Sequence, residues 1–227
     1  MNIFFVGALA LLVGTTASAQ DHLWPDLSRM SAGVSHDNTD EIVATVFKEA
    51  FGDDVRLRAL QTAAFAVPTE DIVFLKQKDD TYTVVYLHTN VLLVSYSSAI
   101  WMRDLRPDNL KPADFHYIRP TRCEAEIPKS LAVEIESVWR EMLLETRYDR
   151  KPRLGMDGGW TEFSMDYNNR ELAGRIWSPD DKTKPGMLVA VADSMQDFCS
   201  KPDKKSYSRL EQRVSDLQRS LTFDVTK

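Results

Sequence analysis

One unit of the chain runs from Cys123 to Cys199, and its main parts are CEAEIPKSLAVEIESVWREM (123–142), GGWTEFSMDYNNRELAGRIW (158–177) and KPGMLVAVADSMQDFC (184–199). The chain contains two cysteines, and they stand at the two ends of this unit. Two cysteines in an oxidising compartment usually pair. We therefore predict a disulfide between Cys123 and Cys199, and the alternative is a pair of buried thiols.

The pattern inside this unit predicts a helix, a three-strand meander and a second helix. Pro128 suits the first turn of a helix, and apolar residues at helical spacing follow it. The second helix is expected to begin near Pro185 and to end before Pro202. Glycine and asparagine turn signals between the helices predict strands, at residues 154–156, 160–165 and 172–177.

The N-terminus has the pattern of a secretory signal peptide. Ile3 to Val13 is a continuous apolar run, and small residues stand at Ala17 and Ala19. Signal peptidases require small residues at these two positions before the cleaved bond. We expect residues 1–19 to be removed after Ala19, which would place the protein in the periplasm or outside the cell. The alternative is a buried N-terminal helix.

The residues between the signal peptide and the cysteine unit predict a second group of elements. Residues 20–38 are polar and irregular, and we expect an extended lead-in that Trp24 pins to the body. Residues 39–118 predict a helix followed by an antiparallel sheet. The helix is expected at 39–51, and strands are expected at 55–67, 72–77, 81–88, 91–96 and 115–118.

These elements predict an α+β fold with two small antiparallel β-meanders, each packed by helices, one disulfide and a C-terminal amphipathic helix. The first meander belongs to residues 39–118, and residues 119–227 hold the disulfide-linked unit and the C-terminal helix. One compact body and two close lobes both fit this pattern. The C-terminal helix has an apolar stripe with spacings of three and four residues, namely Tyr207, Leu210, Val214, Leu217 and Leu221.

Charge and hydropathy argue against nucleic-acid binding and against a membrane-spanning segment. The chain has 34 acidic and 28 basic residues and a net charge of −6, whereas nucleic-acid-binding domains depend on a basic surface. The N-terminal apolar run is about half of the ~20 residues that a membrane span needs. We therefore expect no nucleic-acid partner and no membrane span.

Aromatic and basic side chains are the candidate residues for binding a protein partner. Trp160, Trp177 and Tyr167 stand at the ends of predicted strands, and tryptophan and tyrosine are enriched at interface hot spots. The alternative is that they cover the core. Arg209 and Arg213 lie on the polar face of the C-terminal helix. The stripe within residues 207–221 either packs on the body or forms a homodimer.

No catalytic constellation stands out in the sequence. No two of the four histidines have the spacing of a metal pair, and no Gly-x-Ser-x-Gly turn is present. We therefore predict no catalytic residues, no metal and no cofactor. A hydrolase that uses His88 or His116, which could meet in space, is the least favoured hypothesis.

The function that the sequence favours is an exported, non-catalytic protein-binding module. Its plan is a signal peptide, one disulfide, and small sheets with helices. In this plan, though in no motif, the chain is similar to the inhibitor and immunity proteins with which bacteria neutralise cell-wall hydrolases. An acidic surface would suit a basic hydrolase through electrostatic steering. The alternative is an envelope structural or assembly factor that acts through its C-terminal helix.

We predict that the protein recovered from the periplasm of an expressing bacterium begins at Gln20. N-terminal sequencing or intact mass measurement checks the cleavage site. An Ala19→Asp substitution places a charged side chain where the peptidase requires a small one, so the uncleaved precursor should accumulate. Recovery of the full-length chain from the periplasm, with Met1 retained, would contradict the prediction.

Overall fold

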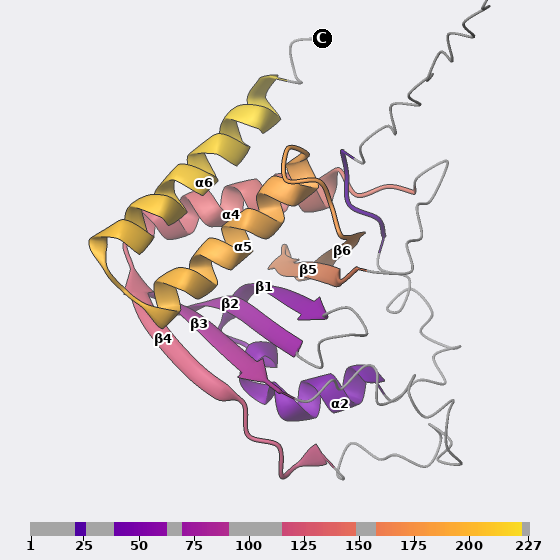
Figure 1. Ribbon diagram of the computed structural model, residues 1–227, viewed down its shortest axis with the longest axis vertical. Helices are drawn as coiled ribbons and strands as arrows, with labels where there is room; N and C mark the ends of the chain where they lie inside the picture. The colour runs from indigo at the N-terminus through magenta and orange to yellow at the C-terminus, as the bar shows by residue number, and fades with distance from the viewer. Residues whose placement is uncertain (1–20, 26–38, 63–69, 91–114, 149–157, 224–227) are drawn as a thin grey trace, which may run out of the picture.

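The structure is a computed structural model, and it describes residues 21–25, 39–62, 70–90, 115–148 and 158–223 (Figure 1). The helices in these residues are α2 (Thr39–Val46), the 3₁₀ helix η1 (Lys48–Phe51), α4 (Lys129–Leu144), α5 (Lys184–Ser200) and α6 (Lys204–Phe223). The strands are β1 (Val55–Thr62), β2 (Glu70–Lys78), β3 (Thr81–Thr89), β4 (Thr121–Ile127), β5 (Trp160–Tyr167) and β6 (Arg170–Trp177).

The strands form one six-stranded antiparallel sheet with the order β4-β3-β2-β1-β5-β6. β1 to β4 make one meander, and β5 and β6 make a hairpin. The pairing of β1 with β5 joins the meander to the hairpin. This pairing runs from Leu57 opposite Met165 to Thr62 opposite Trp160. The predicted α+β class is therefore confirmed. Strands from residues 39–118 and from residues 119–227 share this sheet. The division of the chain between residues 118 and 119 stays a prediction.

The turns of two hairpins agree with the sequence. Asp79 has a φ of 54°, and Asn168 and Asn169 have φ values of 54° and 59°. Aspartate and asparagine tolerate this left-handed backbone better than most residues. The two turns therefore join β2 to β3 and β5 to β6 where the polar residues of the sequence predicted them.

The segment before α4 differs from the prediction. Cys123 lies in strand β4, which was not predicted, and Phe115 has a 3₁₀ conformation and is followed by a turn instead of the expected strand. β4 is an edge strand in which charged, exposed residues alternate with Ala125 and Ile127, which are buried. Its apolar signal is therefore too sparse to indicate a strand. The strands expected at 91–96 and 154–156 lie outside the described residues.

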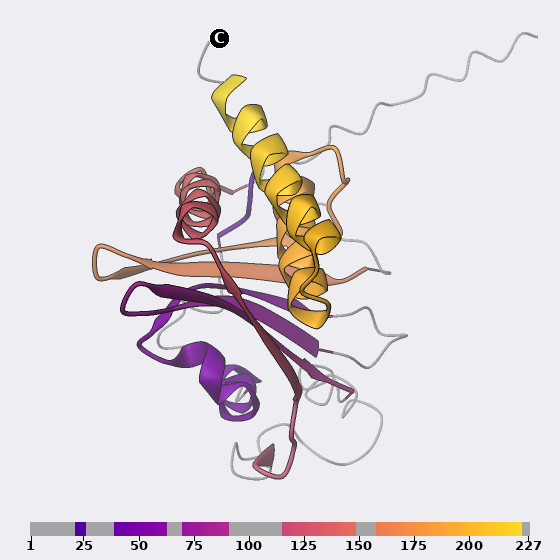
Figure 2. The ribbon, with the colours of Figure 1, turned by 90° about the vertical axis from the view of Figure 1, so that its left-hand side faces the viewer.

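Helices cover both faces of the sheet. α4, α5 and α6 lie on one face, and α2 lies on the other (Figure 2). Alternate residues of each strand face these two layers because side chains in a strand alternate between the faces. The larger core lies under α4, α5 and α6 and includes Leu57, Val73, Trp139, Phe163 and Met195. The smaller core lies against α2 and η1 and includes Ile42, Phe47, Ile72, Phe74 and Val85.

The stripe of the C-terminal helix packs within the chain. Leu210, Val214, Leu217 and Leu221 are buried in the larger core, and α6 packs on α5 and α4. A homodimer through residues 207–221 would therefore have to use the polar face of α6. None of the helices in the described residues is long and apolar enough to cross a membrane.

Trp24 pins the lead-in to the edge of the sheet, as the sequence predicted. The backbone N–H of Trp24 donates to the Arg175 carbonyl at 2.9 Å, and the Arg175 N–H donates back at 2.8 Å. Leu23 is fully buried in the larger core beside Gly174. This short segment therefore covers part of the β6 edge, and residues 26–38 of the lead-in lie outside the described residues.

The disulfide between Cys123 and Cys199 is present. It joins β4, at one edge of the sheet, to the last turn of α5, with a Cα–Cα distance of 5.8 Å. The Cys199 side chain is buried in the larger core, and Cys123 packs against that core. The bond therefore holds α5 over the face of the sheet.

We predict that removing this bond lowers the free energy of unfolding by about 2–5 kcal/mol, the usual range for a native disulfide. The two cysteines are 76 residues apart, and a crosslink of this length removes about 4 kcal/mol of loop-closure entropy from the unfolded chain. Urea unfolding of the Cys123→Ser/Cys199→Ser double variant checks the value. Dithiothreitol should lower the midpoint of the wild type but not that of the double variant. Equal midpoints for the reduced and oxidised wild type would contradict the prediction.

Candidate functional site

Four polar side chains lie side by side across one end of the sheet, on the face that carries α5. Gln61 of β1 is paired with Thr161 of β5 and with Asp71 of β2, and Asp71 is paired with His88 of β3. We call these four residues the polar row. Two residues further along each strand, the same face carries Phe163, Ala59, Val73 and Tyr86, which belong to the larger core or pack against it. The polar row therefore marks the boundary of the core.

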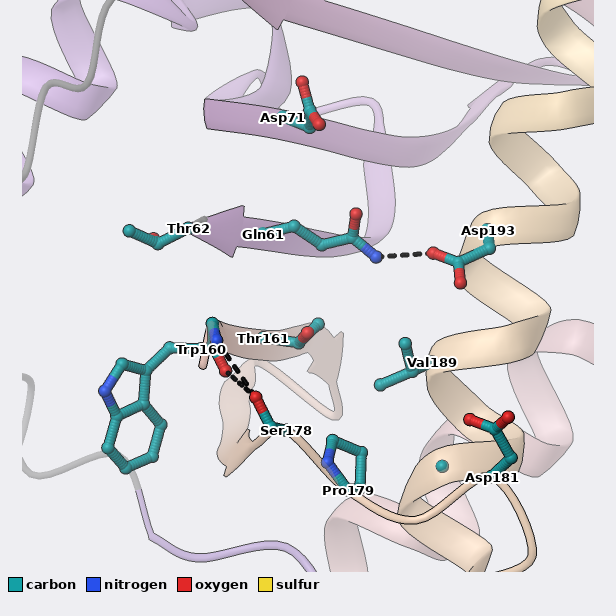
Figure 3. A pocket seen from close by; sticks show the side chains of 12 residues that line it. Gln61, Thr62, Asp71, Trp160, Thr161, Ser178, Pro179, Asp181, Val189 and Asp193 are labelled. Atoms are coloured by element: carbon teal, nitrogen blue, oxygen red, sulfur yellow. Dashed lines mark hydrogen bonds between the residues drawn. The ribbon is translucent and has the colours of Figure 1, made fainter. Parts of the chain in front are cut away.

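A cavity of about 370 Å³ opens between the polar row and the N-terminal half of α5 (Figure 3). α5 contributes residues that are three and four positions apart and therefore lie on one helix face. Gln61 bridges the two sides, since its Nε2 donates to Asp193 Oδ1 at 2.7 Å. The residues that line the cavity include Gln61, Asp71, Thr161, Ser178, Pro179, Asp181, Gly186, Val189 and Asp193.

The connection from β6 to α5 closes the cavity on its third side. Thr183 caps α5, because its Oγ1 accepts a bond from the Gly186 N–H at 3.1 Å and donates to the Asp180 carbonyl at 2.7 Å. A Cβ atom at Gly186 would lie 2.1 Å from that same carbonyl oxygen, so only glycine permits this close approach. The connection is held against the first turn of α5, and this places Asp181 at the cavity.

Ser178 holds the other end of the same connection. Its backbone has a φ of 32°, an uncommon value for a residue with a side chain. Its Oγ accepts a hydrogen bond from the Gly159 N–H at 3.0 Å, and the Ser178 N–H donates to the Gly159 carbonyl at 3.0 Å. These bonds tie the end of β6 to the start of β5 at the mouth of the cavity.

Three carboxylates line the cavity: Asp71, Asp181 and Asp193. Partial enclosure by the cavity walls raises the pKa of Asp193, and the negative charges of Asp197 and Asp181 raise it further. The bond from Gln61 and the charge of Arg213 lower the pKa of Asp193 but do not cancel the rise. The negative charge of Asp193 is therefore unfavourable at this position.

Asp71 differs from the other two carboxylates because a histidine side chain bonds with it. His88 Nδ1 bonds with Asp71 Oδ1, and His88 Nε2 lies 2.7 Å from Asn90 Oδ1. The bond with Asp71 is the main reason that the pKa of His88 is raised, although partial burial opposes it. Burial and the charge of Asp71 raise the pKa of the Tyr86 hydroxyl, which also bonds with Asp71 and Gln196.

The geometry gives little support to the histidine hypothesis. His88 does lie beside a carboxylate of the cavity, but both of its ring nitrogens are occupied by Asp71 and Asn90, so neither is free to take a proton from a nucleophile. His116 lies in the turn before β4 and makes an edge contact with Tyr117. In the described residues, no group of three or more His, Cys, Asp or Glu residues could hold a metal ion.

The aromatic residues proposed for partner binding separate into two places. Trp160 and Trp177 are cross-strand neighbours whose ring centroids lie 5.2 Å apart, and Trp24 lies 5.7 Å from Trp160. The Arg175 guanidinium lies 4.6 Å from the centre of the Trp160 ring. Tyr167 is at the opposite end of β5. The tryptophans therefore pack the lead-in against β5 and β6, and Figure 3 shows the Trp160 ring pointing away from Asp193.

The two arginines proposed on α6 also differ in their surroundings. Arg209 Nη1 donates to Asp197 Oδ2 of α5 at 2.6 Å. Arg213 lines a smaller cavity of about 290 Å³ that it shares with Asp181 and Met187. Arg209 therefore joins two helices, whereas Arg213 shares a cavity with Asp181 and its charge acts on Asp193.

Comparison with known protein families and with curated proteins finds no match for this chain. The geometry and the charge of the cavity are therefore the basis on which we assign a function. Partner binding by Trp160, Trp177, Tyr167, Arg209 and Arg213 remains a prediction.

We predict that Asp193→Asn stabilises the protein at pH 7. A carboxyl whose pKa is raised by folding destabilises the folded state when it is ionised, and the asparagine carbonyl can still accept the bond from Gln61. Because Asp193 is exposed, solvent screening keeps the effect below about 1 kcal/mol, which corresponds to a rise of at most about 2–4 °C in Tm.

Thermal unfolding of the wild type and the variant at several pH values checks this prediction. The difference in Tm should be present at pH 7 and should vanish as the pH falls below about 4, the pKa of an aspartate in an unfolded chain. Asp166→Asn, which makes the same change of charge at an exposed position near the end of β5, is the matched control. A lower Tm for Asp193→Asn at pH 7 would contradict the prediction.

Proposed function

We propose that the protein is an exported protein-binding module that recognises a basic protein partner. The observation that carries this proposal is the open cavity at the end of the sheet, whose ionisable lining residues are the carboxylates of Asp71, Asp181 and Asp193. The net charge of −6 has the same sign as the cavity. A basic partner would be attracted toward the whole chain and then held at this cavity.

Export is the first part of the proposal. The apolar run and the small residues before Gln20 have the pattern of a signal peptide with cleavage after Ala19. The Cys123–Cys199 disulfide supports the same location, because disulfides persist in the periplasm and outside the cell. In the periplasm or outside the cell, the cavity would be exposed to secreted enzymes. The role that we propose there is that of an inhibitor or immunity protein, similar to the proteins that neutralise hydrolases.

The partner that we propose is a different protein and not a second copy of the chain. Two acidic copies would repel each other at the cavity, and the apolar stripe of α6 is already buried within the chain. An envelope assembly role through the C-terminal helix would depend on the polar face of α6, where Arg209 is already paired with Asp197.

We predict that the exported protein, immobilised on a resin, captures a basic protein in a 1:1 ratio from the periplasmic or secreted fraction of the producing organism. Gel filtration and mass spectrometry of the eluted complex check the ratio and the identity. Because charged residues steer the encounter, the association rate should fall steeply between low salt and 0.5 M NaCl.

The Asp181→Asn/Asp193→Asn double variant should lose the captured protein, and Asp166→Asn should retain it. Capture of an acidic protein, or equal capture by the wild type and the double variant, would contradict the proposal that the cavity recognises a basic partner.

A further inference from the structure

We propose that the cavity receives a single cationic side chain, arginine or lysine, that projects from the surface of the basic partner. The inference rests on the proposed function and names the group that the cavity binds. It depends on three properties of the cavity in the described part of the chain, namely two carboxylates that form no ion pair, a hydroxyl that is open to the cavity and makes no hydrogen bond, and its size.

The first property is that two of the three carboxylates form no ion pair with the residues that the structure describes. In the described residues Asp181 and Asp193 form no salt bridge, and the direct partner of Asp193 is the neutral amide of Gln61. Arg213 is close enough to lower the pKa of Asp193 but makes no ion pair with it. A guanidinium or ammonium group in the cavity would donate charge-assisted hydrogen bonds to these oxygens.

The second property is the hydroxyl of Thr161. The Thr161 residue is 7% exposed and lines the cavity from the polar row. Within the described residues its Oγ1 makes no hydrogen bond, and this oxygen is not one of the fully buried polar atoms, so it is open to the cavity. Figure 3 shows Thr161 between Gln61 and Val189, facing the same space as Asp193. A donor N–H of an incoming side chain could bond to this oxygen, and this contact does not depend on the acidic residues.

The third property is the size and the mixed character of the cavity. Its volume of about 370 Å³ is near the lower end of the roughly 300–1,000 Å³ that ligand pockets occupy, which suits one side chain better than a cofactor. Val189 and Pro179 provide apolar wall next to the carboxylates. Arginine and lysine have the matching form, since an apolar stem carries a charged head.

Isothermal titration calorimetry with N-acetyl-arginine methylamide tests the inference on the intact protein. This compound imitates an arginine inside a polypeptide, and N-acetyl-glutamine methylamide is the neutral control. We expect millimolar binding of the arginine compound, at least tenfold weaker binding of the glutamine compound, and a loss of affinity as salt is added. Putrescine, a free diamine, should bind no more tightly than the arginine compound.

Variants identify the groups that hold the cation. Asp181→Asn and Asp193→Asn should each weaken binding of the arginine compound about fivefold to tenfold. Thr161→Val, which removes the hydroxyl at nearly constant volume, should weaken it by a smaller factor. Asp166→Asn is the matched control and should bind like the wild type. Circular dichroism and Tm measurements establish that each variant is folded.

The outcomes separate this inference from the proposed function. Equal affinity for the arginine and glutamine compounds, or wild-type affinity in both aspartate variants, would overturn the inference. Much tighter binding of putrescine would also overturn it, because the ligand would then be a small diamine. If a basic partner is captured but its affinity is unchanged by Asp193→Asn, the inference fails and the proposed function stands. If the arginine compound binds as expected and no partner is captured, the proposed function fails alone.

Discussion

The pairing of β1 with β5 is the interaction on which the rest of the structure depends. It joins the meander of β1 to β4 to the hairpin of β5 and β6, and the larger core extends under α4, α5 and α6 because the sheet is continuous. It also places Thr161 beside Gln61, so the polar row exists only in the joined sheet. The disulfide then holds α5 in place over the same face, and the cavity lies between that helix and the row.

The cavity differs from the neighbouring core in what it does for stability. Two residues away from the polar row, Ala59, Val73 and Phe163 bury apolar surface, which stabilises the fold. At the cavity, partial enclosure and the negative charges of Asp197 and Asp181 raise the pKa of Asp193, so its ionised carboxylate opposes folding. A group that opposes folding in this way is typical of functional sites, where binding of a ligand compensates for it.

Local patterns predicted most of the elements but few of the residues of the cavity. The stripes that follow Pro128 and Pro185 predicted α4 and α5, and Asn168–Asn169 predicted the turn between β5 and β6. Asp193, in contrast, lies off the apolar stripe of α5 and has the pattern of an ordinary exposed residue. Asp181 follows Asp180 in a predicted turn, where aspartate is common for local reasons. Neither pattern indicates that the two carboxylates line one cavity.

The sequence by itself determined the α+β class, the pairing of its two cysteines and the acidic character of the chain, because each depends on local periodicity, on residue counts or on compartment. Tertiary structure alone decided that β4 is an edge strand, that β1 meets β5, and that Gln61, Thr161 and Asp193 face one another. The physical reason is that strand order and register are set by burial of the whole apolar face of the sheet. Residues more than 100 positions apart, such as Gln61 and Asp193, become neighbours only when that burial is complete.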